Sequence, residues 1–448
     1  MKQNKIKTSV KGGGKLKKLA VIADDLTGAN DTGVQFATKS KRTVVFFSKG
    51  DESLQHLTGD VLVFNSDSRA VSPTKAHQIV KALAHEVKQA GISTVFKKID
   101  STLRGNIGAE IDAILDVFAF EVALVVPAFP KGKRTTKMGR QYVNNVPVEE
   151  TELAQDPSSP VLNSDIKEAI NEQSLRKVDV ITLRDVRQGN LRLISKMKTS
   201  MQQKHARILV IDAETEEDLA TIVKASEDLD GPFLWVGTAG IAGHLEGDGE
   251  LVQRQPSFKS DAPCLLVAGS VKTITHQQIH KLKQHIGIQE VIISPEKLLH
   301  NESKEKEIQR VIQESSRFLA CESVIVSTNI EVKVMQEIDK AKEKMKLTNI
   351  EVGARIAEAM GEVAKSLIEK FSLSGVILTG GDIATSTCTK LEGTGIEVSG
   401  EVESGMPYGR LLGGKYDGLP LVTKSGGFGS EEAFIKAIQL LKGTVETA

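Results

Sequence analysis

Short apolar runs recur along the chain, and polar or glycine-rich turns follow them. In the first part of the chain such runs lie at residues 19–23, 43–47, 61–65, 94–99 and 122–127. The run at 19–23 is continuously apolar, which is typical of a strand covered on both faces in a parallel sheet. Segments with helical periodicity, such as 74–90, lie between the runs. This alternation of strands and helices predicts an α/β fold.

The same alternation continues to the end of the chain, with one interruption. Further strands are predicted at 208–212, 233–236, 264–268, 324–327, 375–378 and 419–423, and helices at 108–118, 165–173, 350–369 and 430–441. A chain of 448 residues exceeds the usual size of one core, and a polar stretch without a pattern divides it. We therefore expect two α/β domains with largely parallel sheets flanked by helices. The predicted boundaries are a basic tail over 1–16, a first domain over 17–247, a linker over 248–262 and a second domain over 263–448.

The first strand ends in two adjacent carboxylates, Asp24 and Asp25, ahead of a predicted helix. Open parallel sheets bind ligands at the carboxyl ends of their strands, so one interpretation is a functional site. The other is that the acidic turn only caps the helix. Thr27, Asn30 and Asp31 are further candidate caps.

The strands at 61–65 and 94–99 also end in polar side chains, in the turns NSDSR and KKIDSTLRGN. Ammonium and guanidinium groups bind a carboxylate, while Asp and Ser bind hydroxyl groups. The second turn therefore has the composition of a site for a polyhydroxylated anion, and loops on a rigid sheet often carry such sites. A basic connection follows from Lys131 to Asn145, and a connection of this length is usually functional or disordered.

The overall composition excludes several classes of protein. Acidic and basic residues are equal in number, at 58 each, so no general field attracts nucleic acid or a membrane. The 3 cysteines lie far apart without a CxxC pair, which indicates neither a disulfide framework nor a zinc site and fits a reducing cytoplasm. The lysine-rich N-terminus has no apolar segment typical of a secretory signal, and no apolar run is long enough to span a bilayer.

Three small-residue turns follow predicted strands in the second domain. They are Gly269-Ser270, Thr379 to Asp382, and Ser425 to Gly429, with Ser430 as the expected N-cap of the last helix. Glycines let backbone N–H groups approach phosphate oxygens, and helix starts add a favourable dipole. As a set, the turns indicate a nucleotide site, although neither GxxxxGK[ST] nor GxGxxG occurs.

Five separated motifs resemble the four-carbon acid sugar kinase family, which includes D-threonate, D-erythronate and 3-oxo-tetronate kinases. The motifs are ADDLTGANDTGVQF, KKIDSTLRGN, PAFP with GKRTT and YVNNVPV, LTGGD, and GRLLGGKYDGLPLVTKSGGFG. They occur in the same order as in the family, over nearly the whole chain beyond the tail. The sequence of the first motif is closer to the D-threonate and D-erythronate kinases than to the 3-oxo-tetronate kinases. The residues at positions 145 and 238, Asn145 and Thr238, differ from those of the family's motifs. These differences affect the expected geometry of two turns and not the expected chemistry.

The resemblance implies a kinase that uses ATP to phosphorylate the 4-hydroxyl of a four-carbon sugar acid in carbohydrate acid catabolism. D-Threonate is the expected substrate and D-erythronate the next, with the active site in the interdomain cleft. The expected sugar-acid positions are Asp24 or Asp25, Arg69, Lys98, Ile99, Asp100 and Ser101, to which the composition of the turn adds Arg104. The expected nucleotide positions are Ser270, Gly380, Gly381, Asp382, Gly426, Gly427, Phe428 and Gly429, to which the preceding turn adds Thr379.

Phosphoryl transfer to a hydroxyl needs positioning, charge neutralisation and a nearby carboxylate that accepts the proton. Asp25, Asp24 and Asp100 are the candidates for that base, and the sequence does not rank them. Arg69, Lys98 and Arg104 suit the substrate carboxylate. Mg²⁺ is expected to bridge the ATP phosphates with few protein ligands, and the sequence points to none in particular.

Other functions stay open at this stage. One is a 3-oxo-tetronate 4-kinase, and another is a dehydrogenase or isomerase with a dinucleotide, against which the missing fingerprint argues. The third is a non-catalytic sensor that binds a sugar acid without an ATP site. The expected partners are the small molecules and a second copy of the chain in a homodimer, with no nucleic acid and no membrane.

Overall fold

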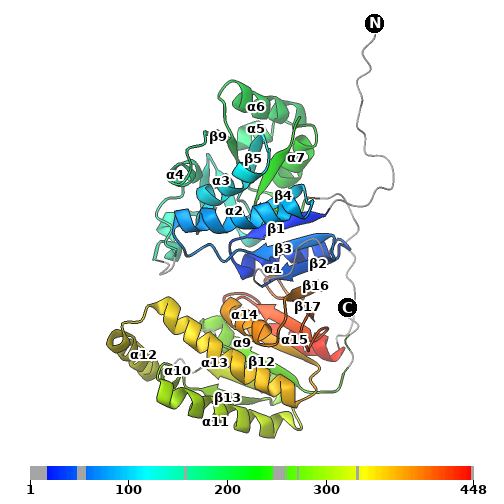
Figure 1. The fold of residues 1–448 in the computed structure, drawn as a ribbon. Coiled ribbons are helices and arrows are strands. Elements are labelled where there is room, and N and C mark those ends of the chain that lie inside the picture. The colour runs from blue at the N-terminus through cyan, green and yellow to red at the C-terminus, as the bar shows by residue number, and fades with distance from the viewer. Residues whose placement is uncertain are drawn as a thin grey trace.

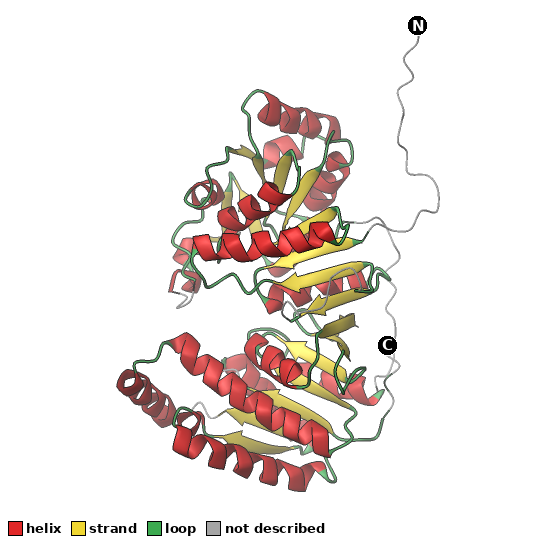
Figure 2. Cartoon of the chain, in the orientation of Figure 1, coloured by secondary structure: helices red, strands yellow, loops and turns green. Residues whose placement is uncertain are grey.

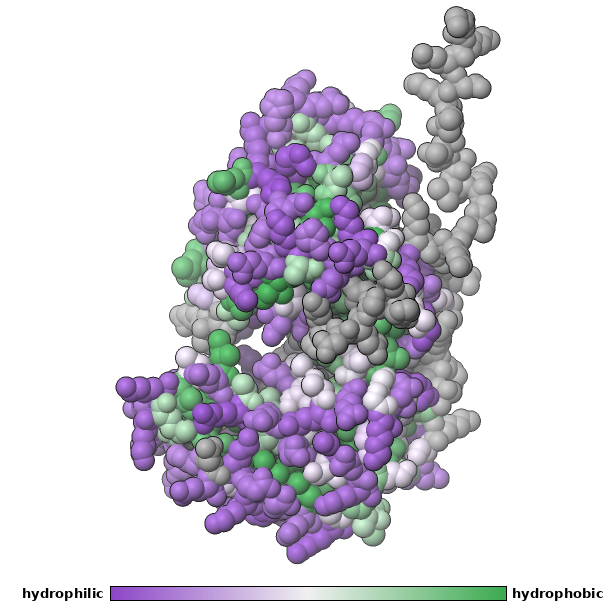
Figure 3. All heavy atoms as spheres, viewed as in Figure 1, coloured by the Kyte–Doolittle hydropathy of each residue, from purple (hydrophilic) through white to green (hydrophobic). Residues whose placement is uncertain are grey.

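The computed structural model describes residues 18–47, 57–155, 159–245, 258, 260–269, 272–328 and 332–444. The predicted tail, most of the predicted linker and Ser270 lie outside the described residues. Hydrophilic side chains cover most of the face shown in Figure 3. Within the described ranges, no helix combines the length and apolar character that crossing a membrane requires.

The N-terminal half contains a parallel sheet covered by helices on both faces, as its continuously apolar strands predict (Figure 2). In spatial order its strands are β2 (Thr43–Phe46), β3 (Val61–Asn65), β1 (Leu19–Ala23), β4 (Thr94–Lys98), β11 (Phe233–Gly237), β5 (Val122–Val126), β10 (Ile208–Ile211) and β9 (Val178–Ile181). Its helices are α1 (Leu26–Ala37), α2 (Pro73–Gln89), α3 (Ile107–Val117), α4 (Ile166–Asn171), α5 (Leu183–Val186), α6 (Asn190–Gln202), α7 (Glu216–Ser226) and α8 (Ala239–Ala242). The prediction of a parallel α/β arrangement is confirmed here.

The C-terminal half repeats this design with a second run of parallel strands. In spatial order these are β13 (Gln289–Ile293), β14 (Val324–Thr328), β12 (Cys264–Ala268), β15 (Gly375–Thr379) and β18 (Pro420–Lys424). Its helices are α9 (Thr273–Ile286), α10 (Pro295–Leu298), α11 (Asn301–Leu319), α12 (Val332–Met345), α13 (Asn349–Lys370), α14 (Gly381–Lys390) and α15 (Ala433–Lys442). Most predicted boundaries agree with these within two residues.

The two halves share one continuous 15-stranded sheet, whereas a separate sheet was expected for each domain. The hairpin of β16 (Gly395–Glu401) and β17 (Pro407–Leu412) continues the C-terminal strands, and β16 then pairs antiparallel with β2. The register runs from Gly395 opposite Phe46 to Val398 opposite Thr43. Figure 1 shows this hairpin between the two halves. The glycine-rich sequence around the hairpin concealed both strands from the prediction.

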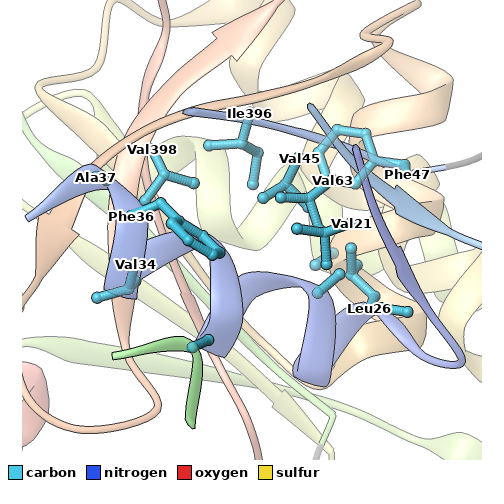
Figure 4. Packing of buried hydrophobic residues seen from close by; sticks show 14 of the residues in the cluster. Val21, Leu26, Val34, Phe36, Ala37, Val45, Phe47, Val63, Ile396 and Val398 are labelled. Carbon is cyan, nitrogen blue, oxygen red and sulfur yellow. The ribbon is translucent and has the colours of Figure 1, made fainter. Parts of the chain in front are cut away.

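Helix α1 is held between the two halves by its apolar face. Val34 and Phe36 belong to the same buried cluster as Val45 of β2 and as Ile396 and Val398 of β16. Figure 4 shows these side chains gathered between the helix and the strands. Because Phe36 is fully buried, the helix has little freedom to rotate, and this fixes the direction of its polar face.

The basic connection that begins after Pro130 is neither a long loop nor disordered. It forms η2 (Pro130–Gly132) and a 3-stranded antiparallel sheet of β6 (Arg134–Lys137), β7 (Arg140–Val143) and β8 (Val146–Pro147). Asp212 holds its first turn by accepting hydrogen bonds from the backbone N–H groups of Met138 (2.7 Å) and Gly139 (2.9 Å). Two further 3-10 turns, η3 (Val148–Glu150) and η4 (Glu152–Gln155), follow this sheet.

The acidic turn does cap α1, as one interpretation of it predicted, whereas the other predicted caps are wrong. The N-cap of α1 is Asp25, whose side chain accepts from the Gly28 backbone N–H, and not Thr27, Asn30 or Asp31. The last helix begins at Ala433, after an N-cap at Glu432 rather than at Ser430. The backbone and hydroxyl of Ser430 instead donate to Glu403.

Candidate active site

Arg69 lies at the centre of a cluster of carboxylates formed by the first three polar turns. Its guanidinium donates to Asp24 through Nε (2.7 Å) and Nη2 (3.1 Å), and to Asp25 through Nη1 (2.8 Å) and Nη2 (2.7 Å). Asp100 lies 3.8 Å from Nη2. The planar fork of arginine suits this double bidentate pairing, which lysine cannot reproduce.

The pKa values of these carboxylates respond to burial and to the nearby cations. Burial alone raises the pKa of Asp24, but the charges of Arg69 and Lys97 outweigh it and leave the pKa below its ordinary value. Burial likewise opposes Arg69 and Arg104 at Asp100, whose pKa falls far below the usual range. At Asp25, burial and the charge of Asp24 together raise the pKa.

The turn that carries Arg69 is held by backbone and side-chain hydrogen bonds from two other elements. The Asp24 carbonyl accepts from the backbone N–H groups of Ser68 and Arg69. Asn106, at the start of α3, donates from Nδ2 to the Ser68 and Val71 carbonyls at 2.9 Å each. The carboxyl ends of β1, β3 and β4 are therefore fixed relative to one another.

A fully buried ion pair supports the cluster from below. Lys97 Nζ lies 2.7 Å from Glu110 Oε2, and Ser68 donates to the other oxygen of Glu110 at 2.5 Å. Burial raises the pKa of Glu110, while the charge of Lys97 lowers it in part. A buried charge is tolerated only when it is paired and hydrogen-bonded in this way.

Lys98 points to the start of α1 and pairs with no carboxylate among the described residues. Its Nζ donates to the Ile99 carbonyl at 2.8 Å. A Cβ atom placed on Gly28 would lie 2.6 Å from this Nζ and 2.8 Å from Asp25 Oδ1. Glycine at position 28 is therefore what allows the ammonium group to approach the helix.

A cavity of about 590 Å³ opens beside the cluster and receives side chains from both halves. Charged residues of the N-terminal half that line it are Asp25, Asp31, Arg69, Lys98, Asp100, Arg104, Arg134 and Glu152. The C-terminal half contributes Ser404, Ser425 and Phe428. The volume is that of a small-molecule site.

The glycine turn after β18 is fastened by helix α9. Gln278 donates from Nε2 to the carbonyls of Phe428 (3.0 Å), Gly429 (3.1 Å) and Ser430 (2.8 Å), and Thr275 donates to the Gly426 carbonyl (2.9 Å). These bonds use carbonyl groups of the turn. The N–H groups of Ser425 and Phe428 donate to backbone carbonyls, whereas those of Gly426 and Gly427 have no acceptor among the described residues. Such backbone N–H groups suit an anion.

A buried lysine stands between the two glycine turns. Lys424 ends β18, and its carbonyl accepts from the Gly380 N–H at 2.9 Å. Its Nζ donates to oxygens of Thr275, Ser425 and Gly426, and no carboxylate among the described residues pairs with it. Burial lowers the pKa of Lys424 to about 8. A buried ammonium that no carboxylate neutralises, beside two glycine turns, fits the phosphates of a nucleotide.

The start of α1 reaches the glycine turns directly. Leu26, Thr27, Asn30 and Asp31 share a small recess with Gly380, Gly381, Lys424 and Ser425. Asn30 donates to Thr423 at 3.3 Å. The first two turns of α1 therefore lie between the carboxylate cluster and the glycine turns.

Comparisons with known proteins agree with this division of the chain. Residues 19–245 match a family described as a sugar-binding N-terminal domain, and residues 265–434 match a nucleotide-binding C-terminal domain. A D-threonate kinase of Salmonella typhimurium is 36% identical over 95% of this chain and 98% of its own length. The chain belongs to the four-carbon acid sugar kinase family.

Two further relatives support the family assignment and the fold. A D-erythronate kinase of Heliobacterium modesticaldum is 33% identical over 94% of this chain and 97% of its own length. A solved structure from Salmonella typhimurium has a TM-score of 0.78, with 23% identity over 94% of this chain and 98% of that one. At this identity the likeness supports the fold alone.

The structure of this four-carbon acid sugar kinase brings most of the predicted sugar-acid residues to one cavity. Asp25, Arg69, Lys98, Asp100, Ser101 and Arg104 line it. Asp24 is 2% exposed and reaches the site through Arg69. The side chain of Ile99 lies in the core, and its backbone carbonyl accepts from Lys98.

Only some of the predicted nucleotide residues line the recess. Gly380 and Gly381 line it, and Gly380 has φ +105° at the N-cap of α14. Phe428 lines the larger cavity. Thr379 is buried, and Asp382 lies close enough to Asp67 that its charge, after burial, raises the pKa of Asp67. The turn that Gln278 and Thr275 hold contains Gly426, Gly427 and Gly429. Ser270 lies outside the described residues.

Four residues of this kinase site were not predicted from the sequence. Asp31 was considered only as a cap, although it lies four residues after Thr27 and therefore on the same face of a helix. Lys424 lies within the last of the five motifs, but no role was predicted for it. Arg134 lies in the basic connection that was predicted to be functional or disordered, but nothing distinguished it from the other basic residues there. Gln278 carried no signal, because its place depends on the packing of α9. Within the described ranges, no three His, Cys, Asp or Glu side chains are grouped to hold a metal ion.

Replacing Gly28 with alanine is expected to weaken sugar-acid binding by the kinase roughly tenfold, about 1.4 kcal/mol. The added methyl displaces the Lys98 ammonium and also crowds Asp25 Oδ1. Alanine in a helix is favourable by up to about 1 kcal/mol, which opposes the cost of the second contact, so stability is expected to change little. Isothermal calorimetry and thermal unfolding measure the two effects. Gly353→Ala is the matched control, because nothing lies within 4 Å of its added Cβ. Unchanged sugar-acid affinity in Gly28→Ala would contradict the role of the close approach.

Proposed function

We propose that the protein transfers the γ-phosphoryl group of ATP to the 4-hydroxyl of a four-carbon sugar acid. D-Threonate is the proposed substrate, and D-erythronate the next. The observation that carries the proposal is the cavity itself, which joins a cluster of charged side chains in one half to the glycine turns of the other. A kinase needs these two sites at a distance that one small substrate can span.

Three cations of the cavity are the proposed partners of the substrate carboxylate. Lys98 makes no ion pair within the described part of the chain, and Arg104 pairs with Asp100, a carboxylate that also lies beside Arg69. Arg134 donates to the Gly132 carbonyl, but its buried Nε has no hydrogen-bond partner among the described residues. Arg69 is also a proposed binding residue, although Asp24 and Asp25 occupy most of its N–H groups.

The nucleotide is proposed to bind with its phosphates at Lys424 and the N-terminus of α14. Gly380, with its positive φ at the N-cap, and Gly381 line the recess, so the N-terminus of α14 lies beside it. Mg²⁺ belongs to the same proposal, since it bridges phosphate oxygens and keeps most of its own water. Closure of the cleft over both substrates would exclude water and limit hydrolysis of ATP.

The choice of D-threonate is supported by the relatives. The D-threonate kinase of Salmonella typhimurium is 36% identical to this chain, and the D-erythronate kinase of Heliobacterium modesticaldum 33%. A homodimer and a cytoplasmic location also remain proposals. Light scattering on the purified chain tests the first, and fractionation of the source cell tests the second.

A coupled assay of ADP release tests the proposed reaction. Wild-type protein with ATP and Mg²⁺ is incubated with D-threonate, D-erythronate, L-threonate or 3-oxo-tetronate, and NMR locates the phosphate on the product. The expected result is the highest kcat/KM with D-threonate and phosphate on its fourth carbon. The highest value with 3-oxo-tetronate would replace the substrate assignment. Binding of a sugar acid without turnover of any would favour the sensor.

A further inference from the structure

Asp31 is the carboxylate that stands between the two parts of the site. It lies in the second turn of α1, one turn beyond Thr27, and lines both the 590 Å³ cavity and the recess formed with the glycine turns. Thr27 and Ser425 also line both spaces. A hydroxyl attacking a phosphorus atom must sit at this boundary, because its carbon skeleton lies on one side and the phosphate on the other.

The three carboxylates considered from the sequence are already engaged. Asp24 and Asp25 each accept two hydrogen bonds from Arg69, and Asp25 also caps α1. Asp100 accepts from Arg104 and from the hydroxyl and backbone of Thr102. The nearby cations lower the pKa values of Asp24 and Asp100, which makes these two carboxylates weak proton acceptors. Asp25 has a raised pKa, but its oxygens already accept from Arg69 and from the Gly28 N–H.

The carboxylate of Asp31 is free of such bonds within the described part of the chain. No described residue donates a hydrogen bond to its side chain, and the contact with Gln35 Nε2 involves only its backbone carbonyl. The apolar face of α1, fixed between β2 and β16, keeps its polar face directed to the cavity. Its oxygens are therefore available to a substrate hydroxyl.

We propose that Asp31 is the catalytic base that accepts the proton of the sugar-acid hydroxyl during phosphoryl transfer, an inference that rests on the proposed function. The hydroxyl oxygen forms a bond to the γ-phosphorus of ATP. The bond from that phosphorus to the β–γ bridging oxygen breaks, and its electron pair leaves with ADP. The hydroxyl proton moves to the carboxylate of Asp31 and then to solvent, so that atoms and charge balance.

The surroundings of Asp31 make its carboxylate more basic than usual. Burial raises the pKa of Asp31 to about 7. The positive charge of Lys98 opposes this effect, whereas the negative charges of Asp25, Glu401 and Asp100 add to it. Glu401, an exposed residue at the end of β16, also has a pKa raised by partial desolvation, which Lys131 lowers in part. A general base works best when its pKa lies near the pH of the reaction.

The test is the variant Asp31→Asn, measured with the acid that wild-type protein turns over best. Its kcat is expected to fall roughly 10²- to 10⁴-fold, the usual contribution of a general base. The affinities for ATP and for the sugar acid, measured by calorimetry, are expected to stay within about threefold, about 0.65 kcal/mol. Asp230→Asn is the control, since the side chain of Asp230 is 92% exposed. Asp230 precedes β11, whereas Thr238, which follows the other end of that strand, lines the cavity. This variant is expected to leave kcat unchanged.

Two further measurements separate catalysis from structure. Because the folded-state pKa of Asp31 is raised, stability is lost as the pH rises through about 7, so Asp31→Asn is expected to unfold at a higher temperature than wild type at pH 8. The wild-type kcat/KM is expected to fall tenfold per pH unit below about 7, and the residual activity of Asp31→Asn to lose this dependence.

The outcomes distinguish this inference from the function on which it rests. If wild type phosphorylates none of the acids, the proposed function fails and the assignment of Asp31 falls with it. If wild type is active and Asp31→Asn retains more than about a third of kcat, a change below about 0.7 kcal/mol, only the assignment fails. Recovery of Asp31→Asn by excess Mg²⁺ would overturn it in favour of a metal ligand.

Discussion

Replacing Arg69 with alanine is expected to destabilise the protein by about 3–5 kcal/mol and to abolish phosphoryl transfer. The Arg69 side chain is 15% exposed, and its guanidinium neutralises Asp24 and Asp25, with Asp100 close by. Without it, these carboxylates face one another in a partly dry site, where like charges repel strongly. Urea unfolding at about pH 7.5 and ADP release measure the two losses.

The variant Arg69→Lys separates charge from geometry. Lysine supplies one positive charge but cannot pair bidentately with two carboxylates, so we expect a stability between those of wild type and Arg69→Ala. The pH dependence gives a second readout. Asp24 and Asp100 have lowered pKa values, so the stability that they contribute is present above about pH 4 and is lost as the pH falls further. This acid loss should shrink in Arg69→Ala, and a urea midpoint equal to wild type would contradict the cluster's role.

Replacing Lys424 with methionine is expected to weaken ATP binding roughly 10- to 100-fold while leaving sugar-acid binding intact. The loss corresponds to the usual strength of a hydrogen bond to a charged group, about 1.5–3 kcal/mol. Lys424 is 2% exposed and borders the recess with Gly380 and Gly381, whereas it does not line the larger cavity. Calorimetry with ATP and, separately, with the sugar acid measures both affinities.

The same variant should stabilise the nucleotide-free protein. Burial lowers the pKa of Lys424 to about 8, so the charged form is disfavoured on folding. The cost is full below about pH 8 and disappears as the pH rises toward the unfolded value of about 10.4. Lys424→Met should therefore unfold at a higher temperature than wild type at about pH 7, with a smaller difference at about pH 10. Lys333→Met, at an exposed position of α12, is the control; equal ATP affinity in Lys424→Met and wild type would refute the phosphate contact.

The elements predicted most accurately were those whose pattern is local. Strands such as β1 and β15 are continuously apolar because helices cover both of their faces, and helix α13 has a complete capping box at Thr348 and Glu351. The hairpin of β16 and β17 escaped prediction, because its glycines oppose strand formation and its partner β2 lies about 350 residues away in sequence. Long-range pairing of this kind leaves no periodic signal.

The residues of the candidate site also differ in whether a local sequence pattern predicts their place. Asp24, Arg69 and Asp100 could be predicted to approach one another, because parallel strands bring their carboxyl ends to one edge. That Arg69 would bind the aspartates rather than remain free for substrate depends on side-chain distances, which no sequence pattern encodes. The place of Asp31 beside the site could have been predicted from its helical spacing to Thr27. The role of Lys424 could not, because it depends on the groups that surround its side chain.

The pairing of β2 with β16 also limits how this chain can be divided. A truncated chain that ended between the halves would leave β2 or β16 as an unprotected strand edge, together with the apolar side chains of Val45 or Ile396. Such edges recruit other strands and promote aggregation. Fragments for separate ligand-binding experiments would therefore need to be co-expressed, as a split protein whose pieces reassemble, or to carry a grafted strand that occupies the open edge.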